Sequence, residues 1–123
     1  MSPIDEFKEH LLEAEHVLDT EFSFDRAEPN YLRCLEVVAA NPLHRAEFAK
    51  ALTGLFDGKL VSDEPVAFLM HALQWPEVRS WAEESLSTMA RPDIHGRPYE
   101  KIIKAYERDW ENREFYRAFR DAV

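Results

Sequence analysis

Residues 62–90 read SDEPVAFLMHALQWPEVRSWAEESLSTMA and form the most apolar part of a strongly charged chain. From Val66 to Trp75, apolar side chains point in nearly every direction around a helical wheel, which predicts a helix buried on most sides. His71 is one of two polar residues that interrupt it. After Pro76 the apolar residues narrow to one stripe, which predicts a second helix with one buried and one solvated face. We call residues 62–90 the hub, because they locate the core.

Helical patterns also flank the hub. Residues 3–18 carry an apolar stripe after a Ser-Pro start, which predicts a first helix. Thr20–Glu28 breaks the helical period and is predicted to be a connector held by two aromatic side chains, after which a second helix begins at Pro29 or Asn30. A third helix is predicted over residues 42–57. Residues 99–119 predict two terminal helices, separated by a break near residues 109–112.

These patterns predict an all-α, single-domain bundle of about six to seven short helices that spans residues 1–123. A second architecture stays open because the chain contains a weak internal echo. At an offset of 34 residues, Asn41-Pro42 aligns with Trp75-Pro76 and Leu35 aligns with Leu69. This echo would suit a short HEAT-like or TPR-like stack of helical pairs.

The charge of the chain is unevenly distributed. A formal net charge of −9 and a pI of about 5.0 argue against sequence-independent binding to nucleic acid or anionic lipid. Residues 1–28 hold nine acids and two bases, a net charge of −7, whereas residues 29–123 have a net charge of −2. The basic residues after residue 96 alternate with acids, which predicts a solvated helix surface with pairs such as Glu100 with Lys104.

Three features predict a cytoplasmic protein without a membrane span. The first ten residues, MSPIDEFKEH, are acidic and lack the basic and apolar regions of a signal peptide. The longest apolar run, Val66–Met70, is far shorter than the roughly 18 residues of a membrane-spanning helix. Cys34 is the only cysteine, which suits a reducing compartment, and its place in a helical pattern predicts a small core residue.

The acidic N-terminal arm predicts a face for a basic protein partner, because a patch of one sign speeds encounter with a patch of the opposite sign. The acids proposed to contact this partner are Glu6, Glu9, Glu13, Glu21 and Asp25. A solubilising surface without a partner is the alternative interpretation.

Arg91–Pro98, RPDIHGRP, lies between two prolines and contains a glycine, which predicts a loop. Its Asp93, His95 and Arg97 are further candidate partner contacts. An acid, an imidazole and a guanidinium would also suit an anion site or acid–base chemistry.

His71 is predicted to be a buried neutral imidazole with one hydrogen-bond partner.

No catalytic residue, cofactor or metal site is predicted. Glu13 and His16 have the Glu-x-x-His spacing of di-iron bundles, but the motif occurs once and His16 lies about opposite Phe7, away from the core stripe. The three glycines do not form a phosphate-binding loop, and no cysteine–histidine pair has zinc-site spacing.

The sequence therefore leaves two functions open. The first is a non-catalytic protein-binding module, similar in size and charge to an immunity protein or antitoxin that neutralises a basic, nuclease-like toxin through its acidic face. The second is a small helical enzyme or ligand-binding bundle with a pocket near His71 or the Asp93–Arg97 loop. The first is favoured over an enzyme. A homodimer is a further alternative.

Overall fold

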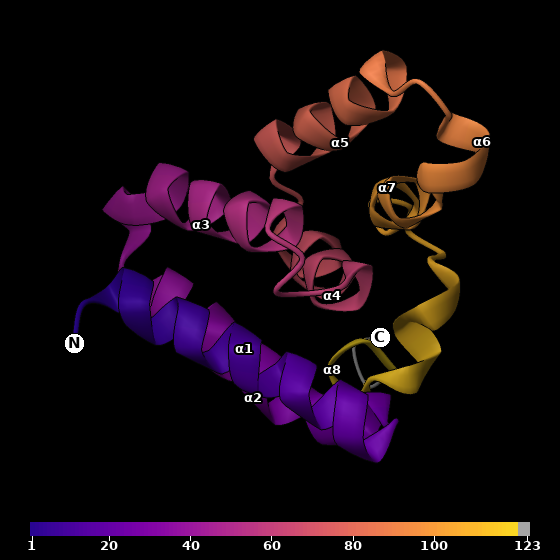
Figure 1. The fold of residues 1–123 in the computed structure, drawn as a ribbon. Coiled ribbons are helices and arrows are strands. Elements are labelled where there is room, and N and C mark those ends of the chain that lie inside the picture. Colours follow the sequence, from indigo (N-terminus) through magenta and orange to yellow (C-terminus); the bar gives the residue numbers. More distant parts are fainter. Residues whose placement is uncertain (121–123) are drawn as a thin grey trace.

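The helix α4 (Asp63–Leu73) lies at the centre of the computed structural model, which describes residues 1–120 (Figure 1). Every residue from Glu64 to Met70 is buried. Four helices pack against it: α1 (Pro3–Glu21), α2 (Phe24–Ala40), α3 (Arg45–Asp57) and α7 (Arg97–Lys104). The prediction that the first half of the hub is a helix buried on most sides is confirmed.

The chain reverses between α4 and the next helix, α5 (Pro76–Thr88). α4 ends at Leu73 because Gln74 adopts a left-handed conformation with a φ of 55°. The side-chain amide of Gln74 donates hydrogen bonds to the carbonyls of Met70 and His71, at 3.2 and 3.1 Å, and so caps the last turn. Trp75 could not extend α4 easily, since the residue before a proline disfavours the helical region.

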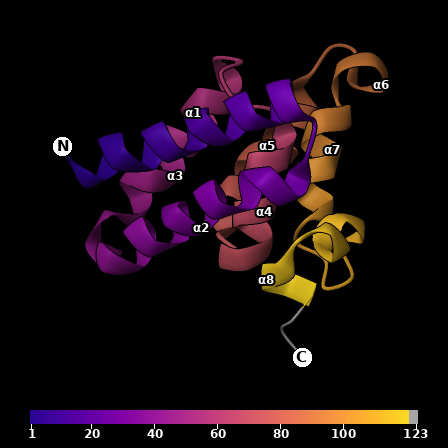
Figure 2. The same cartoon turned by 90° about the horizontal axis from the view of Figure 1, so that it is seen from below.

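α1 and α2 form an antiparallel hairpin and lie side by side in Figure 2. The hydroxyl of Ser2 accepts a hydrogen bond from the backbone N–H of Asp5 at 3.1 Å, which confirms the predicted start of the first helix. α1 buries one stripe, which consists of Phe7, Leu11, Ala14 and Val17. α1 therefore presents its opposite side to solvent.

The predicted connector over Thr20–Glu28 is wrong. α1 continues to Glu21 and α2 starts at Phe24, so only Phe22 and Ser23 join the two helices. Phe22 turns the chain in a left-handed conformation with a φ of 53°, which is uncommon for a residue other than glycine. The hydroxyl of Ser23 caps α2, and Pro29 lies inside that helix rather than at its start.

α3 follows a short 3-10 helix, η1 (Pro42–His44), and packs against α5. Asn41 and Trp75 both precede a proline that begins a helix, so the internal echo corresponds to a real local similarity. The principal neighbours of α5 are α7 and α3, however, and α4 is not among them. The residues described by the structure thus favour a bundle over a stack of helical pairs.

The predicted loop over Arg91–Pro98 is also wrong. Pro92 begins the four-residue helix α6 (Pro92–His95), and Pro98 lies in the first turn of α7. Both prolines therefore occupy the first turn of a helix, where the missing N–H group removes no hydrogen bond within the helix. Gly96 forms the tight corner between the two helices.

The C-terminal segment contains a 3-10 helix, η2 (Glu111–Phe115), and a single turn, α8 (Arg117–Arg120). It is anchored by Tyr116, which is fully buried and packs its ring against those of Phe68 and Tyr31, with centroid distances of 4.8 and 6.0 Å. α7 ends at Lys104, so the predicted break between the two terminal helices begins earlier than expected.

Residues 1–120 form eight α-helices and two 3-10 helices without a strand, and their buried side chains make one continuous core. The predicted all-α fold class is confirmed. The helix count exceeds the prediction because α6 forms within the predicted loop. None of the helices in this part of the chain is both long and apolar enough to cross a membrane.

Candidate functional site

Three of the predicted acids share one exposed face of α1. Glu6, Glu9 and Glu13 are spaced by three and four residues and lie on the side away from the buried stripe. Glu6 is 3.7 Å from the imidazole of His10. Glu9 and Glu13 form no ion pair within 4 Å with any residue of 1–120. Leu12, which is 42% exposed, lies on the same outward side of the helix.

Two other acids of the N-terminal arm form hydrogen bonds within the protein instead of an exposed acidic surface. Glu15 accepts hydrogen bonds from the backbone N–H and the hydroxyl of Ser62, at 2.9 and 2.8 Å, and thereby holds the start of α4. Glu28, which is only 5% exposed, accepts hydrogen bonds from the N–H groups of Arg117 and Ala118 at 3.0 and 2.9 Å. The acidic surface is therefore smaller than the sequence count implies.

Glu21 and Asp25 lie at the α1–α2 turn, apart from the other predicted acids. Glu21 forms an ion pair with Arg26 at 3.4 Å, and Asp25 is exposed in the first turn of α2. Along α1, Glu21 is about 12 Å from Glu13, because a helix rises about 1.5 Å per residue. The five predicted acids consequently form two groups rather than one patch.

Asp93, His95 and Arg97 do not converge. Asp93 accepts two hydrogen bonds from the guanidinium of Arg91, at 3.3 and 3.1 Å, and this contact lowers the pKa of Asp93. His95 lines a cleft beside Tyr99, whereas Arg97 lines a different pocket on the other side of α7. The geometry brings no acid–imidazole–guanidinium cluster together in this segment.

Cys34 belongs to the core, and His71 is half-buried at its edge. Nδ1 of His71 lies 2.7 Å from the carbonyl oxygen of Ala105, and the ring packs between Trp110 and Phe119 with centroid distances of 5.0 and 4.6 Å. The thiol of Cys34 is buried and donates a weak hydrogen bond to the carbonyl of Phe7 at 3.7 Å. Burial raises the pKa of Cys34 to about 12, so the thiol stays protonated. The prediction for Cys34 is confirmed, whereas His71 is only half-buried, with Ala105 as its hydrogen-bond partner.

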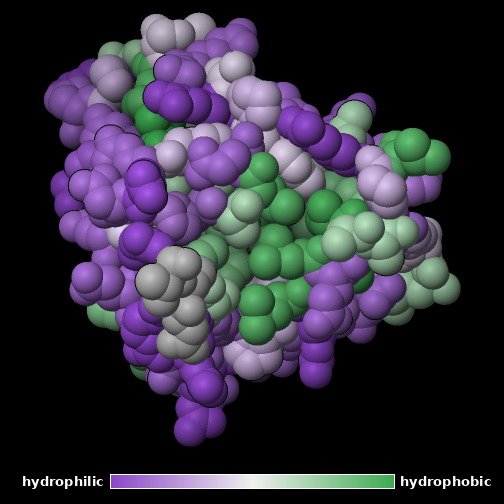
Figure 3. All heavy atoms as spheres, turned by 180° about the vertical axis from the view of Figure 1, so that it is seen from behind, coloured by the Kyte–Doolittle hydropathy of each residue, from purple (hydrophilic) through white to green (hydrophobic). Residues whose placement is uncertain are grey.

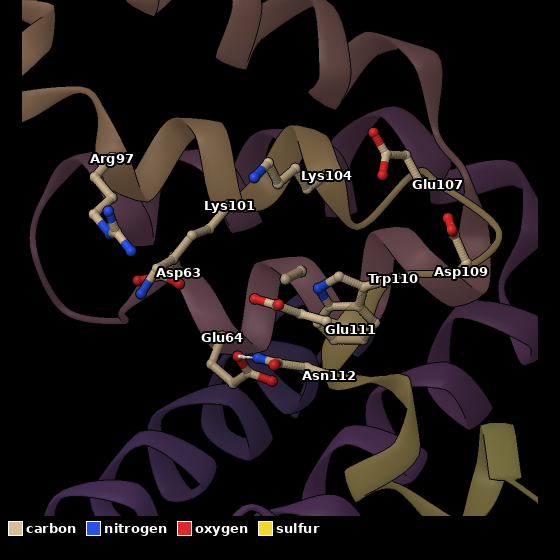
Figure 4. Close-up of a pocket in the computed structure, with 11 residues that line it drawn as sticks. Asp63, Glu64, Arg97, Lys101, Lys104, Glu107, Asp109, Trp110, Glu111 and Asn112 are labelled. Atoms are coloured by element: carbon tan, nitrogen blue, oxygen red, sulfur yellow. Dashed lines mark hydrogen bonds between the residues drawn. The ribbon is translucent and has the colours of Figure 1, made fainter.

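A pocket of about 330 Å³ lies between the start of α4, α7 and η2 (Figure 4). One wall consists of Arg97, Lys101 and Lys104, whose spacing of four and three residues places them on one side of α7. The opposite side of that helix buries Ile102 in the core. The amphipathic pattern of α7 therefore turns a row of three cations toward the pocket.

The opposite wall of this pocket is acidic. Glu107, Asp109 and Glu111 come from the segment after α7. In Figure 4, Glu107 and Asp109 lie on the side of the pocket away from Arg97, and Glu111 lies between them and Asp63. Trp110, which is 5% exposed, and the buried Ala67 supply apolar surface between the walls. We call this site the α4–α7 pocket.

A buried carboxylate fixes the base of the α4–α7 pocket. Glu64 is 8% exposed and accepts hydrogen bonds from the amide of Asn112, at 2.9 Å, and from the hydroxyl of Tyr116. Burial raises the pKa of Glu64, and these two hydrogen bonds act in the opposite direction. Burial also raises the pKa of Asp63, against the nearby positive charge of Lys101.

The sequence indicated only part of this site. The spacing of Arg97, Lys101 and Lys104 was visible, but alternating charges favoured a solvated surface with a Glu100–Lys104 pair. Those two side chains form no ion pair within residues 1–120. The convergence of α7 with α4 and η2 is a tertiary contact that helical spacing does not reveal.

Metal-ligating side chains do not gather in the described part of the chain: residues 1–120 contain no group of three or more His, Cys, Asp or Glu that could hold a metal ion. Glu13 and His16 are both exposed on α1.

The face opposite to the view of Figure 1 carries an apolar area bordered by charged residues (Figure 3). Exposed apolar patches are common at interaction sites. The homodimer alternative stays a prediction that light scattering tests.

No protein-family model, curated protein or solved structure matches this chain.

Proposed function

We propose that this protein is a non-catalytic binding module that engages a basic protein partner through the outward face of α1. The observation that carries the proposal is the pair Glu9 and Glu13, two exposed carboxylates on one helix face with no ion-pair partner within residues 1–120. The exposed Leu12 on that side supplies an apolar contact within a charged rim, the usual composition of a protein interface.

The scaffold supports this function because it holds α1 rigidly. α1 buries its inner stripe against α2, α3 and α4, and Glu15 ties it to the start of α4. A preorganised helix loses little conformational entropy on binding. In this proposal the protein acts like an immunity protein or antitoxin toward a basic, nuclease-like toxin. Cys34 is a buried free thiol, which suits the reducing cytoplasm where we place the encounter.

The test begins with a two-hybrid screen against fragments of the source genome and continues with association kinetics of each partner at several salt concentrations. We expect a basic partner whose association rate falls as ionic strength rises, because salt screens steering between exposed charges. The double variant Glu9→Gln/Glu13→Gln should slow association by roughly two- to tenfold and change dissociation less.

The matched control is Glu84→Gln/Glu114→Gln, which makes the same change in net charge at exposed positions on α5 and η2. This control should associate nearly as fast as the wild type. The proposal is overturned if the screen yields no basic partner, if association is insensitive to salt, or if both double variants behave alike.

A further inference from the structure

The charged side chains of the α4–α7 pocket are unusual because they are close together yet unpaired. Arg97, Lys101 and Lys104 form one wall, with Asp63 and the buried Glu64 beside Lys101, and three acids of residues 107–111 also line the pocket. No cation of this wall forms an ion pair within 4 Å with any residue of 1–120, and neither do the three acids. Asp63 and Glu64 offset part of the charge of Lys101, whereas Arg97, Lys104 and the three acids of residues 107–111 have no ion-pair partner within residues 1–120.

This arrangement selects against ligands of a single charge. A simple anion would be attracted by the α7 wall and repelled by Glu107, Asp109 and Glu111. A simple cation would be attracted by the acids and repelled by Arg97, Lys101 and Lys104. A ligand with a carboxylate and an ammonium group satisfies both walls at once, through charge-assisted hydrogen bonds.

The base of the pocket is held in place before any ligand arrives. Asn112 donates to the buried carboxylate of Glu64, and Tyr116 donates to the same group from the core. These bonds fix the segment that carries the acidic wall onto the start of α4. The indole of Trp110 and the methyl group of Ala67 add an apolar surface between the walls. The volume of about 330 Å³ lies within the range of small-molecule sites, roughly 300–1,000 Å³.

We propose that the α4–α7 pocket binds a small zwitterion, a free amino acid or a short peptide, with its carboxylate at Lys101 and Lys104 and its ammonium group at the acidic wall. An apolar side chain of the ligand packs on Trp110. The site is separate from the α1 face, so this proposal does not depend on the proposed protein partner. It also moves the ligand-binding alternative away from His71, whose ring packs against Trp110 and Phe119.

The experiment uses the full chain and two sets of probes, the twenty free amino acids tested singly and trialanine. Ligand-observed NMR detects binding, and calorimetry then measures the affinity. We expect at least one probe to bind at a ratio of one to one. Acetylation of its amino group, or amidation of its carboxylate, should weaken binding about tenfold or more, because each removes a charge-assisted contact. The comparison between the two sets distinguishes a free amino acid from a peptide.

Two pocket variants locate the binding. Lys104→Gln and Glu111→Gln should each weaken binding about tenfold, since both side chains are exposed and line the pocket. The controls Lys50→Gln on α3 and Glu84→Gln on α5 remove the same charges outside it and should leave affinity unchanged. Thermal unfolding checks that all four variants fold.

Three results would overturn the proposal. The first is that no probe binds at millimolar concentration. The second is that acetylated or amidated probes, or acetate and methylamine, bind as tightly as the zwitterion. The third is that the pocket variants retain wild-type affinity.

Discussion

Glu64 is the residue at which the C-terminal segment meets the hub. It lies in the first turn of α4, where the helix dipole favours a negative charge, and it accepts hydrogen bonds from Asn112 and Tyr116. Burial nevertheless raises its pKa, so the loss of water outweighs these favourable contacts. The fold therefore retains a carboxylate whose charged form is less stable in the native state than in the unfolded chain.

This shift predicts a pH dependence. A carboxylate whose native pKa lies above its usual value of 4.5 favours folding most below that value, and this contribution is lost as the pH rises through the native pKa. Glu64→Gln does not titrate. The unfolding free energy of the variant minus that of the wild type should therefore increase as the pH rises above about 4.5. Urea unfolding at a series of pH values measures this difference.

Asp63 is present in both proteins, so its raised pKa makes the unfolding free energy of each fall in a similar way as the pH rises. Glu84→Gln, which removes a carboxylate at an exposed position on α5, is measured in parallel as the control. A pH-independent difference between Glu64→Gln and the wild type would show that burial does not control the ionisation of Glu64.

At the level of the elements, the corner between α6 and α7 requires a residue without a side chain. Gly96 has an ordinary φ of −86°, so its backbone conformation does not demand glycine. A Cβ atom at this position would lie 2.5 Å from the carbonyl oxygen of Pro92 and 2.6 Å from Cδ2 of Leu86. The reasons for the glycine are thus the tight turn of α6 onto its own Pro92 carbonyl and the close approach of Leu86 from α5.

Gly96→Ala should lower the unfolding free energy by about 1–3 kcal/mol, because the Pro92 carbonyl is backbone and cannot move aside without shifting α6. Gly54→Ala is the matched control. A Cβ at Gly54, inside α3, meets no atom within 4 Å, so this substitution should stabilise the protein by up to about 1 kcal/mol through helix propensity. Chemical denaturation measures both changes. If both variants change the unfolding free energy in the same direction, the packing argument is refuted.

The elements that the sequence predicted correctly are those with strong local signals. α4 was predicted from apolar residues on all sides, and the start of α1 from a Ser-Pro cap. The α1–α2 turn was missed because Phe22 takes a left-handed conformation that local patterns assign to glycine or asparagine. The corner at Gly96 was missed because prolines at helix starts and prolines in loops look alike in a sequence.

The candidate sites were predictable to a smaller extent. Glu9 and Glu13 were identified because exposure follows directly from their position on an amphipathic helix. Glu28 belongs to the same acidic arm, but it turns inward to cap α8, a contact across some 90 residues of sequence. The acidic wall opposite Lys104 likewise depends on how the segment after α7 folds back. Distant contacts of this kind leave no periodic signal.

Across the whole molecule, the hub supplies the centre of the core and also part of the α4–α7 pocket, because Glu64 and Ala67 of α4 line that pocket. The proposed α1 face contains no hub residue and lies on a helix that packs against α4. Glu15 and Glu28 show how this support works, because each caps an element that is distant in the sequence. A change in the hub should therefore alter stability, and a change on α1 should alter association.

A pair of variants tests this division. Leu69 is fully buried in α4, so Leu69→Ala should lower the unfolding free energy by about 2–5 kcal/mol through lost burial and the cavity that remains. Glu9→Gln/Glu13→Gln removes only exposed groups and should change it by less than about 0.5 kcal/mol. Urea unfolding gives both values, and association kinetics at a temperature where Leu69→Ala stays folded should match the wild type. A Leu69→Ala protein of near wild-type stability would mean that α4 is not the structural centre, because neighbouring helices would then hold the core without it.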